Sequence, residues 1–177
     1  MFRVAARTRP GDASALTQRN EAMDFRITGL SPDPFVHLYG QSDAALKARN
    51  VIRVPVNAKP GFPDRIEMRD GEIGEAMLLL NHLYQPALSP YRGCHAIYVR
   101  EGATKAFDAI NRIPPVMQSR LLALRAFDDQ HMIIHAELGE GAELAALIQD
   151  LLARPKTRYI QAHNAGRGCF SGLIRPA

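Results

Sequence analysis

Residues Tyr159 to Phe170 read Tyr-Ile-Gln-Ala-His-Asn-Ala-Gly-Arg-Gly-Cys-Phe. A strand-like run ends here in a polar turn that contains two glycines, and a second strand-like run follows the turn. If the two runs pair through a three- or five-residue loop, His163 lies directly opposite Cys169, with Cβ atoms about 4.5–5.5 Å apart. The stretch matches no catalytic or cofactor motif that is defined by spacing. It predicts a hairpin whose turn is rich in chemically useful side chains.

The segments beside this hairpin have clear periodicities. The two strands are expected at Thr157 to His163 and Phe170 to Ile174. Upstream, Gly141 to Ala153 has apolar residues at helical spacing, acidic residues near its start and Pro155 after its end. This segment is the one long helix that the sequence predicts.

Alternating apolar residues predict short strands in the rest of the chain. Leu121 to Phe127 and Met132 to Leu138 are expected to form a hairpin. Glu75 to Tyr84 contains four consecutive apolar residues, which favour a strand covered on both faces, although a helix stays open there. Val51 to Val56 contains Pro55, which confines that strand to an edge or a strand end. Further strands are predicted near residues 25–27, 65–69 and 96–100, and a helical turn or two at residues 103–110.

The order of these segments predicts the fold class. About eight short strands and one substantial helix do not alternate along the chain, which argues against a doubly wound parallel sheet. We therefore expect an α+β domain, with a mostly antiparallel sheet and the helix at residues 141–153 packed across it.

One globular domain fits the length and composition. The chain has 177 residues, of which 46% are hydrophobic, and one core can bury about 70% of the extended-chain surface at this size. We expect this domain at residues 23–177. Residues 1–22 lack an apolar period and are rich in arginine, so we expect a disordered tail or a mis-assigned start upstream of Met23. An organellar transit peptide is the alternative.

Several features favour a cytoplasmic protein. The longest apolar run, Ala76 to Leu80, has five residues, whereas a membrane-spanning helix needs roughly 20. The first twenty residues contain no apolar segment of the secretory type. Two cysteines, Cys94 and Cys169, are too few for a disulfide scaffold and are expected to be reduced. We expect no membrane association, and the oligomeric state stays open.

The charge pattern argues against a nucleic-acid partner. The net charge is +4, but residues 1–22 supply +2 of it, with four arginines against two acidic residues. The rest of the chain is nearly balanced and contains no run of basic residues and no alternation of aromatic and basic residues. A nucleic-acid partner is therefore not expected.

The turn quoted above supports two interpretations. A neighbouring imidazolium or the Arg167 guanidinium favours the thiolate form of a cysteine, so Cys169 as nucleophile with His163 as base is one hypothesis. In the other interpretation, Cys169 is a small buried apolar residue, while His163 and Asn164 satisfy backbone groups of the turn.

A second concentration of polar groups lies at Ser89 to His95. Tyr91 and Arg92 stand side by side at the entry to a strand, where a phenol and a guanidinium can hold a carboxylate or a phosphate. The alternative is a tyrosine packed on the sheet edge beside a solvated arginine.

No metal or cofactor site is predicted. His131 and His135 are four residues apart, which on a strand separates them by roughly 13 Å. A metal site assembled from Cys94, His95, His163 and Cys169 is conceivable, but no spacing requires it. The glycine-containing turns at residues 71–74 and 139–141 lack the pattern and the lysine of a phosphate-binding loop.

Five strings of residues, in this order along the chain, resemble those of a known family. They are Lys59-Pro60-Gly61-Phe62-Pro63, Leu79-Leu80-Asn81 with Gln85-Pro86, Ser89-Pro90-Tyr91-Arg92, Val99-Arg100-Glu101, and Ala162-His163-Asn164 followed by Arg167-Gly168-Cys169. The family is the group of small bacterial proteins known as domain of unknown function 1203. The resemblance covers about residues 25–174 and implies a bacterial protein, but it implies no activity because the family has none assigned.

The chain departs from the family pattern at two places. A cysteine commonly follows the Pro-Gly-Phe-Pro string in the family, where this chain has Asp64. The glycine- and proline-containing entry to the strand near residue 97 is replaced by Gly93-Cys94-His95-Ala96. A function that needs the first of these thiols would be in doubt here.

Three functions follow as hypotheses. The first is binding of a small anionic metabolite in a pocket where Arg92 and Arg167 hold the anion and Asn164 orients it; the other expected lining residues are Tyr91, Asn81 and His163. The second is an enzyme that uses Cys169 with His163. The third is a protein-interaction module that uses the edge at Val51 to Val56.

Overall fold

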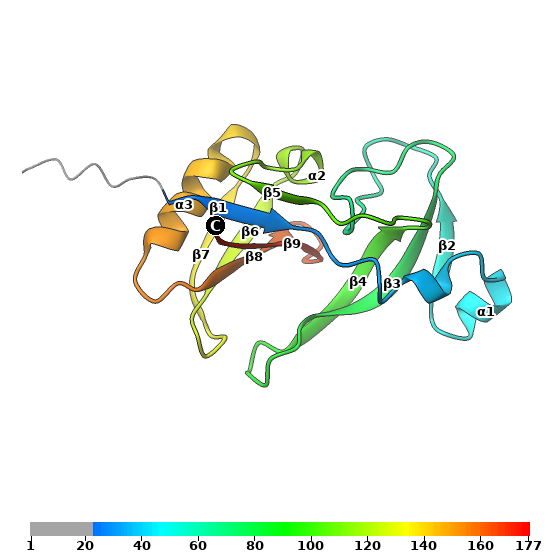
Figure 1. Cartoon of the computed structure of the whole chain (residues 1–177), viewed down its shortest axis with the longest axis horizontal. Helices are drawn as coiled ribbons and strands as arrows, with labels where there is room; N and C mark the ends of the chain where they lie inside the picture. Colours follow the sequence, from blue (N-terminus) through cyan, green and yellow to red (C-terminus); the bar gives the residue numbers. More distant parts are fainter. Residues whose placement is uncertain (1–22) are drawn as a thin grey trace, which may run out of the picture.

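The computed structural model describes residues 23–177, so the expectations for residues 1–22 lie outside the described residues. In the described part, nine strands form two antiparallel sheets (Figure 1). The predicted α+β class with antiparallel strands is confirmed, but the strands divide between two sheets instead of forming one. No helix in this part of the chain is both long and apolar enough to cross a membrane.

The larger sheet has six strands in the order β5-β1-β9-β8-β6-β7. Its hairpins β6–β7 and β8–β9 confirm the two strand pairs predicted from alternation. The strands are β1 Phe25–Thr28, β5 Asp108–Ile110, β6 Leu122–Phe127, β7 Ile133–Gly139, β8 Tyr159–Asn164 and β9 Phe170–Pro176.

The predicted long helix forms as a 3-10 turn, η2 (Gly141–Glu143), that continues into α3 (Leu144–Ala153). Glu140 and Glu143 form a capping box that satisfies backbone N–H groups at the start. The buried side chains of α3 pack against β6, β7 and β8, as Figure 1 shows at the orange helix. This apolar stripe therefore positions the helix on the six-stranded sheet.

The smaller sheet contains β2 (Ile52–Pro55), β3 (Ala76–Gln85) and β4 (Gly93–Arg100), with β3 in the middle. β2 lies at the sheet edge and ends at Pro55, which confirms the position predicted from this proline. The core under this smaller sheet also includes residues of the short helical elements η1 (Val36–Leu38) and α1 (Asp43–Lys47).

A loop at residues 61–70 replaces the strand predicted at residues 65–69. Asp64 is fully buried, and its carboxylate accepts hydrogen bonds from the backbone N–H groups of Ile66, Glu67 and Arg100 at 2.6–3.2 Å. These contacts give the backbone an alternative to a strand ladder. The prediction of a strand here is therefore wrong, because a buried side chain organises the backbone into a loop.

This loop connects the two cores. Ile66 belongs to the core under the smaller sheet, while Met68 belongs to the core under the larger sheet. The backbone of the loop lies close to residue 29, where a Cβ atom would be 2.1 Å from the Ile66 carbonyl oxygen. Only glycine therefore fits at position 29.

The segment after β4 also differs from expectation. The helical turn predicted within residues 103–110 is wrong, because residues 108–110 form β5 and pair with β1. One helical turn, α2 (Pro115–Gln118), starts instead at a proline, whose missing N–H costs nothing in the first turn.

Candidate functional site

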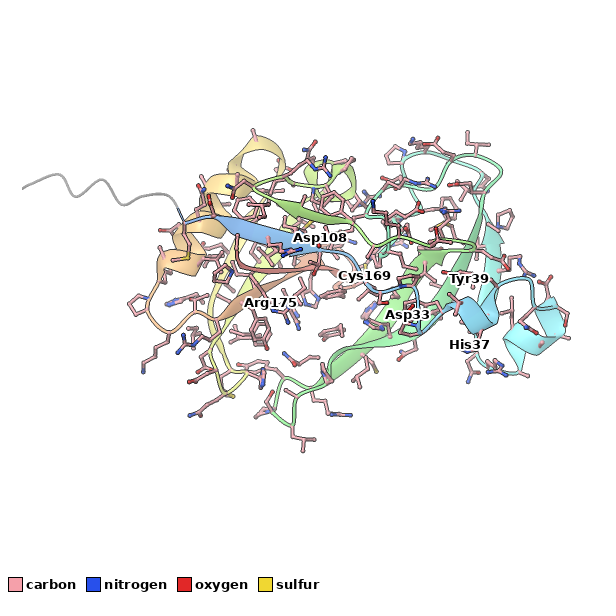
Figure 2. All side chains as sticks on the ribbon, in the orientation of Figure 1. Asp33, His37, Tyr39, Asp108, Cys169 and Arg175 are labelled. Atoms are coloured by element: carbon pink, nitrogen blue, oxygen red, sulfur yellow. The ribbon has the colours of Figure 1, made fainter. Side chains whose placement is uncertain are left out.

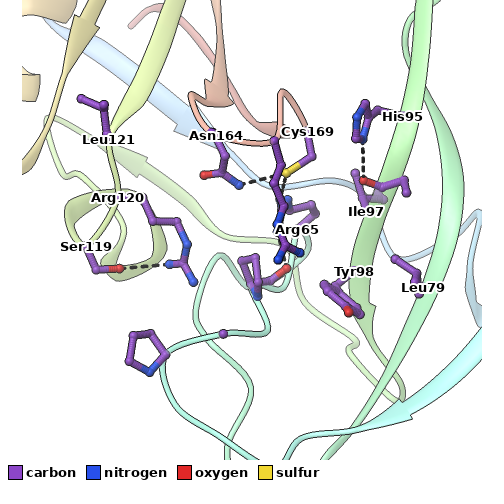
Figure 3. A pocket seen from close by; sticks show the side chains of 16 residues that line it. Arg65, Leu79, His95, Ile97, Tyr98, Ser119, Arg120, Leu121, Asn164 and Cys169 are labelled. Carbon is purple, nitrogen blue, oxygen red and sulfur yellow. Dashed lines mark hydrogen bonds between the residues drawn. The ribbon is translucent and has the colours of Figure 1, made fainter.

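A cavity of about 640 Å³ lies between the two sheets and the loop at residues 61–70. Its volume is in the range of small-molecule sites. Figure 2 places Cys169 between the sheets, and Figure 3 shows side chains from both sheets around the cavity. The lining side chains that can donate or accept hydrogen bonds are Arg65, His95, Tyr98, Ser119, Arg120, Asn164, Arg167 and Cys169.

The turn between β8 and β9 sets the positions of three of these residues. β8 continues through Asn164, whose N–H donates to the Cys169 carbonyl at 2.9 Å and whose carbonyl accepts from the Gly168 N–H at 2.7 Å. Gly168 has a φ of +74°, a conformation that favours glycine. The backbone partner of Cys169 is therefore Asn164.

The expectation that His163 lies directly opposite Cys169 is wrong. His163 pairs with Phe170, next to a break in the register after Ala162. The reason is that β8 runs one residue further than expected, to Asn164, and β9 begins at Phe170, so that residues 165–169 lie between the two strands. A shift of one residue changes the cross-strand partner and the face of every side chain beyond it.

His163 is a buried part of the turn. Its side chain is 0% exposed, and its Nδ1 lies 3.0 Å from the Gly168 carbonyl oxygen, to which it donates because a carbonyl can only accept. Burial lowers the pKa of the imidazole to about 4, so His163 is neutral at pH 7. No hydrogen bond between His163 and Cys169 occurs among residues 23–177.

Arg65 is the most unusual cavity residue. It is 1% exposed, and its guanidinium donates to the Phe170 carbonyl at 2.7 Å, to the Pro63 carbonyl and to Cys169 Sγ at 3.3 Å. Within the described part of the chain it forms no ion pair with a carboxylate. Burial lowers the pKa of Arg65, but a guanidinium starts so far above neutrality that it keeps its charge.

Cys169 receives two N–H donors. Asn164 Nδ2 lies 3.1 Å from Cys169 Sγ, and Arg65 Nη2 approaches the same sulfur at 3.3 Å (Figure 3). The Oδ1 of Asn164 is buried and has no hydrogen-bond partner in residues 23–177. The cysteine is a free thiol. The site thus contains a sulfur that two N–H groups contact, and an amide oxygen that has no partner in the described residues.

The other two arginines of the cavity differ in their charge balance. Arg120 makes two hydrogen bonds, of 2.5 and 2.9 Å, to the Asp70 carboxylate, which neutralises much of its charge. Arg167 is exposed, and no ion pair or hydrogen bond of its side chain is found among the described residues. Within the part of the chain that the structure describes, no aspartate or glutamate lines the cavity.

The structure brings together only some of the residues predicted for a site. Asn164, Arg167 and Cys169 line the cavity, while His163 is buried behind the turn. Asn81 was expected on the most buried strand, but it is exposed and pairs with Ala96. The reason is that Asn81 and Leu83 lie on the outward face of this part of β3, whereas Leu80 and Tyr84 on the opposite face pack on the core.

Tyr91 and Arg92 lie in the turn between β3 and β4, away from the cavity. Tyr91 packs edge-on against the Phe127 ring at 6.2 Å, and Arg92 donates to the Pro86 carbonyl. Both are exposed, and neither lines the cavity between the sheets. The structure therefore does not bring Arg92 to the cavity that the turn at residues 163–169 lines.

Sequence reasoning missed four of the polar residues around the cavity. Arg65 directly follows the Pro-Gly-Phe-Pro string and Asp64, so that string was the available signal, but it served only for the family resemblance. The others come from β4 and from the segment before β6, where no local pattern marks them. The missed residues are Arg65, Tyr98, Ser119 and Arg120, while His95 was considered only as a metal ligand.

A second cavity, of about 490 Å³, lies on another side of the fold. Its polar groups largely bind each other: the Tyr159 hydroxyl lies 2.8 Å from Gln85 Nε2 and 2.9 Å from His131 Nδ1, and Gln161 donates to the Tyr84 carbonyl. The first cavity therefore has more unused hydrogen-bonding capacity.

No group of three or more metal-ligating side chains occurs in residues 23–177. In the conceivable metal set, Cys94 is exposed on β4 and faces Leu83 across the strand pair, while His163 is buried in the other sheet. These residues do not converge on one point.

Comparisons with known proteins give a family but no function. No curated protein and no solved structure matches the chain. A family model described as protein of unknown function (DUF1203) matches residues 61–175. This range is shorter than the resemblance at residues 25–174 indicated, but it includes every cavity-lining residue except Pro60. The chain therefore belongs to the DUF1203 family, and the cavity between its sheets is built almost entirely from the part that the family shares.

Proposed function

We propose that the protein binds a small anionic ligand, one that bears a carboxylate or a phosphate, in the cavity between the sheets. One observation carries the proposal: the cavity is lined by three arginines and no acidic residue, and the most buried of the three has no carboxylate partner in the described part of the chain. Arg65 and Arg167 hold the anion in this proposal, and Asn164 orients it.

The energetics of Arg65 favour an anion. A buried charge is costly unless it is paired and hydrogen-bonded, and the protein satisfies Arg65 only with two carbonyls and a sulfur. A guanidinium has five N–H donors, of which these three contacts use three. The two remaining donors can bind oxygen atoms of a carboxylate or a phosphate, whose geometry a guanidinium matches.

The other two hypotheses have less support. An enzyme with His163 as base lacks a contact between the imidazole and Cys169, and the only polar hydrogen of the neutral ring is donated to a carbonyl. A protein-interaction module at β2 stays a prediction: the strand is at a sheet edge and Ile52 is 58% exposed, but nothing indicates a partner.

A thermal-shift screen tests the proposal. Phosphate monoesters and di- and tricarboxylates are compared with neutral amide or alcohol analogues of the same size. A ligand at 100 times its dissociation constant adds about 2.7 kcal/mol of stability, so we expect at least one class of anions to raise the melting temperature. The proposal fails if every anion shifts the melting temperature no more than its neutral analogue does.

A further inference from the structure

We propose that Cys169 is a nucleophilic thiolate held by Arg65 and Asn164, and that it attacks an electrophilic atom of the anionic ligand in the cavity between the sheets. This inference rests on the proposed function for the ligand's charge. It differs from the pair expected in the sequence, because the group that activates the sulfur is the Arg65 guanidinium and not the His163 imidazole.

The first argument is the polarity of the contacts at the sulfur. Arg65 Nη2 and Asn164 Nδ2 both point an N–H at Cys169 Sγ, at 3.3 and 3.1 Å. No group in residues 23–177 accepts a hydrogen bond from this sulfur. Two donors and no acceptor suit a thiolate, because a thiolate only accepts, whereas a thiol has a hydrogen of its own to place.

The second argument is the charge of Arg65, and it is independent of the cysteine. Arg65 is 1% exposed and has no carboxylate partner among the described residues, so its guanidinium needs a counter-charge from another group. Among residues 23–177, Cys169 is the only side chain to which the Arg65 guanidinium donates a hydrogen bond. A cysteine beside a cation is the environment in which thiolates form and react.

The third argument is access. Cys169 and Arg65 both line the cavity of about 640 Å³, so a ligand that enters it reaches the sulfur. Arg167 lies at the same turn and carries a charge that no described residue neutralises. Two cationic side chains and the sulfur therefore line one space.

The reaction is a displacement at the sulfur. Cys169 Sγ gives an electron pair to the electrophilic atom of the ligand and forms a new bond to it. The bond from that atom to its leaving group breaks, and the leaving group departs with the bonding pair. No oxidant or reductant takes part, and any proton on the sulfur is released to solvent.

Cys94 provides an internal control. It is also a free thiol, but it is exposed on β4, and no hydrogen bond to its sulfur is found among the described residues. If access alone decided reactivity, Cys94 would react faster than the half-buried Cys169. The proposal predicts the opposite order.

Alkylation of the full chain with iodoacetamide tests the nucleophile. The neutral reagent is attacked at its methylene carbon and iodide leaves, and mass spectrometry of peptides measures the rate at each cysteine. We expect Cys169 to react at least about tenfold faster than Cys94, a factor that one charge-assisted hydrogen bond can supply. Equal or slower reaction at Cys169 overturns the inference.

Iodoacetate, the anionic counterpart, separates this inference from the proposed function. If the cavity binds anions, the ratio of the iodoacetate rate to the iodoacetamide rate is higher at Cys169 than at Cys94, and Arg167→Gln lowers that ratio. Fast reaction with iodoacetamide but no preference for iodoacetate contradicts anion binding and leaves the nucleophile standing. A preference for iodoacetate together with a slow reaction of iodoacetamide supports anion binding and contradicts the nucleophile.

Two variants test the activating groups. Asn164→Asp keeps the shape of the side chain but replaces the N–H donor with a carboxylate oxygen, so we expect the iodoacetamide rate at Cys169 to fall at least about tenfold. Arg92→Gln removes a charge of the same kind outside the cavity and leaves that rate as it is. A rate that Asn164→Asp does not change contradicts the proposed thiolate. Circular dichroism confirms that each variant is folded.

Discussion

The arginines on the two sides of the loop at residues 61–70 differ in the groups that accept their hydrogen bonds. On one side, Arg69 and Arg100 meet the carboxylates of Glu67 and Glu75, with Arg69–Glu75 at 2.7 Å and Arg100–Glu67 at 2.6 Å. On the other side, Arg65 meets only carbonyls and a sulfur in the described part of the chain.

The difference shows which of the two clusters has capacity for a ligand. In the paired cluster the charges neutralise each other, and the bond from Arg69 lowers the pKa of Glu75 to about 2. An anion gains little there, because carboxylates already occupy the guanidinium donors. In the cavity, the buried guanidinium of Arg65 keeps its charge and two unused N–H groups. We therefore expect structural roles for the paired cluster and a binding role for the cavity.

Arg65→Met should produce the largest change. The apolar side chain leaves the buried carbonyls of Pro63 and Phe170 without donors, so we expect the free energy of unfolding to fall by at least about 3 kcal/mol. Urea denaturation followed by circular dichroism measures the loss. A loss below about 1 kcal/mol would mean that Arg65 does not connect the loop to β9 in solution.

The pH dependence of stability is expected to be the next largest effect. The pKa of His163 is about 4 in the folded protein, below the ordinary value of about 6.5. The unfolded chain therefore binds more protons between these values, so this stabilisation is complete above about pH 6.5 and is lost as the pH falls towards 4.

The loss from His163 should be about 1 kcal/mol between pH 6.5 and 5.5. Burial also lowers the pKa of His82, which acts in the same direction. Urea denaturation at several pH values, for the wild-type protein and for His163→Gln and His82→Gln, separates the two contributions. An unchanged slope in His163→Gln would show that the imidazole is accessible to protons in the folded state.

Arg167→Gln compared with Arg92→Gln gives a smaller but more selective effect. Both arginines are exposed, and both were expected to bind the anion, but only Arg167 lines the cavity. We expect the affinity for the best anion of the screen to fall about tenfold in Arg167→Gln, the loss of one charge-assisted contact. Arg92→Gln should bind as the wild-type protein does. Isothermal titration calorimetry measures the affinity of both variants. A loss in Arg92→Gln but not in Arg167→Gln would indicate that the anion binds at the turn between β3 and β4 instead.

Glu67→Gln should have the smallest effect. Glu67 is partly exposed and its partner Arg100 also contacts two backbone carbonyls, so we expect a loss of less than about 1 kcal/mol in the free energy of unfolding. Urea denaturation beside Arg65→Met makes the comparison direct. A loss as large as that of Arg65→Met would remove the distinction between the paired cluster and the cavity.

Local patterns in the sequence were sufficient for most of the secondary structure. Alternation placed the hairpins β6–β7 and β8–β9, helical spacing placed α3, and Pro55 placed β2 at an edge. These features depend on neighbours in sequence, and burial of one face is enough to define them. The α+β class follows from their order along the chain.

The site depended on information that local patterns do not contain. Arg65 is buried because it donates to Phe170, 105 positions away, and its alternating neighbours resembled a strand. His163 pairs with Phe170 because β8 runs one residue further and the register breaks after Ala162, which no spacing in the sequence marks. Tertiary contacts and loop length therefore decided the points at which sequence reasoning failed.

The position of a bound anion tests the central claim most directly. Crystals of the wild-type protein soaked in selenate should show an anomalous selenium peak in the cavity, within hydrogen-bond distance of Arg65 and Arg167. An empty cavity, in crystals where selenate is bound beside Arg92 or in the cluster of Arg69 and Arg100, would contradict the assignment of the anion site.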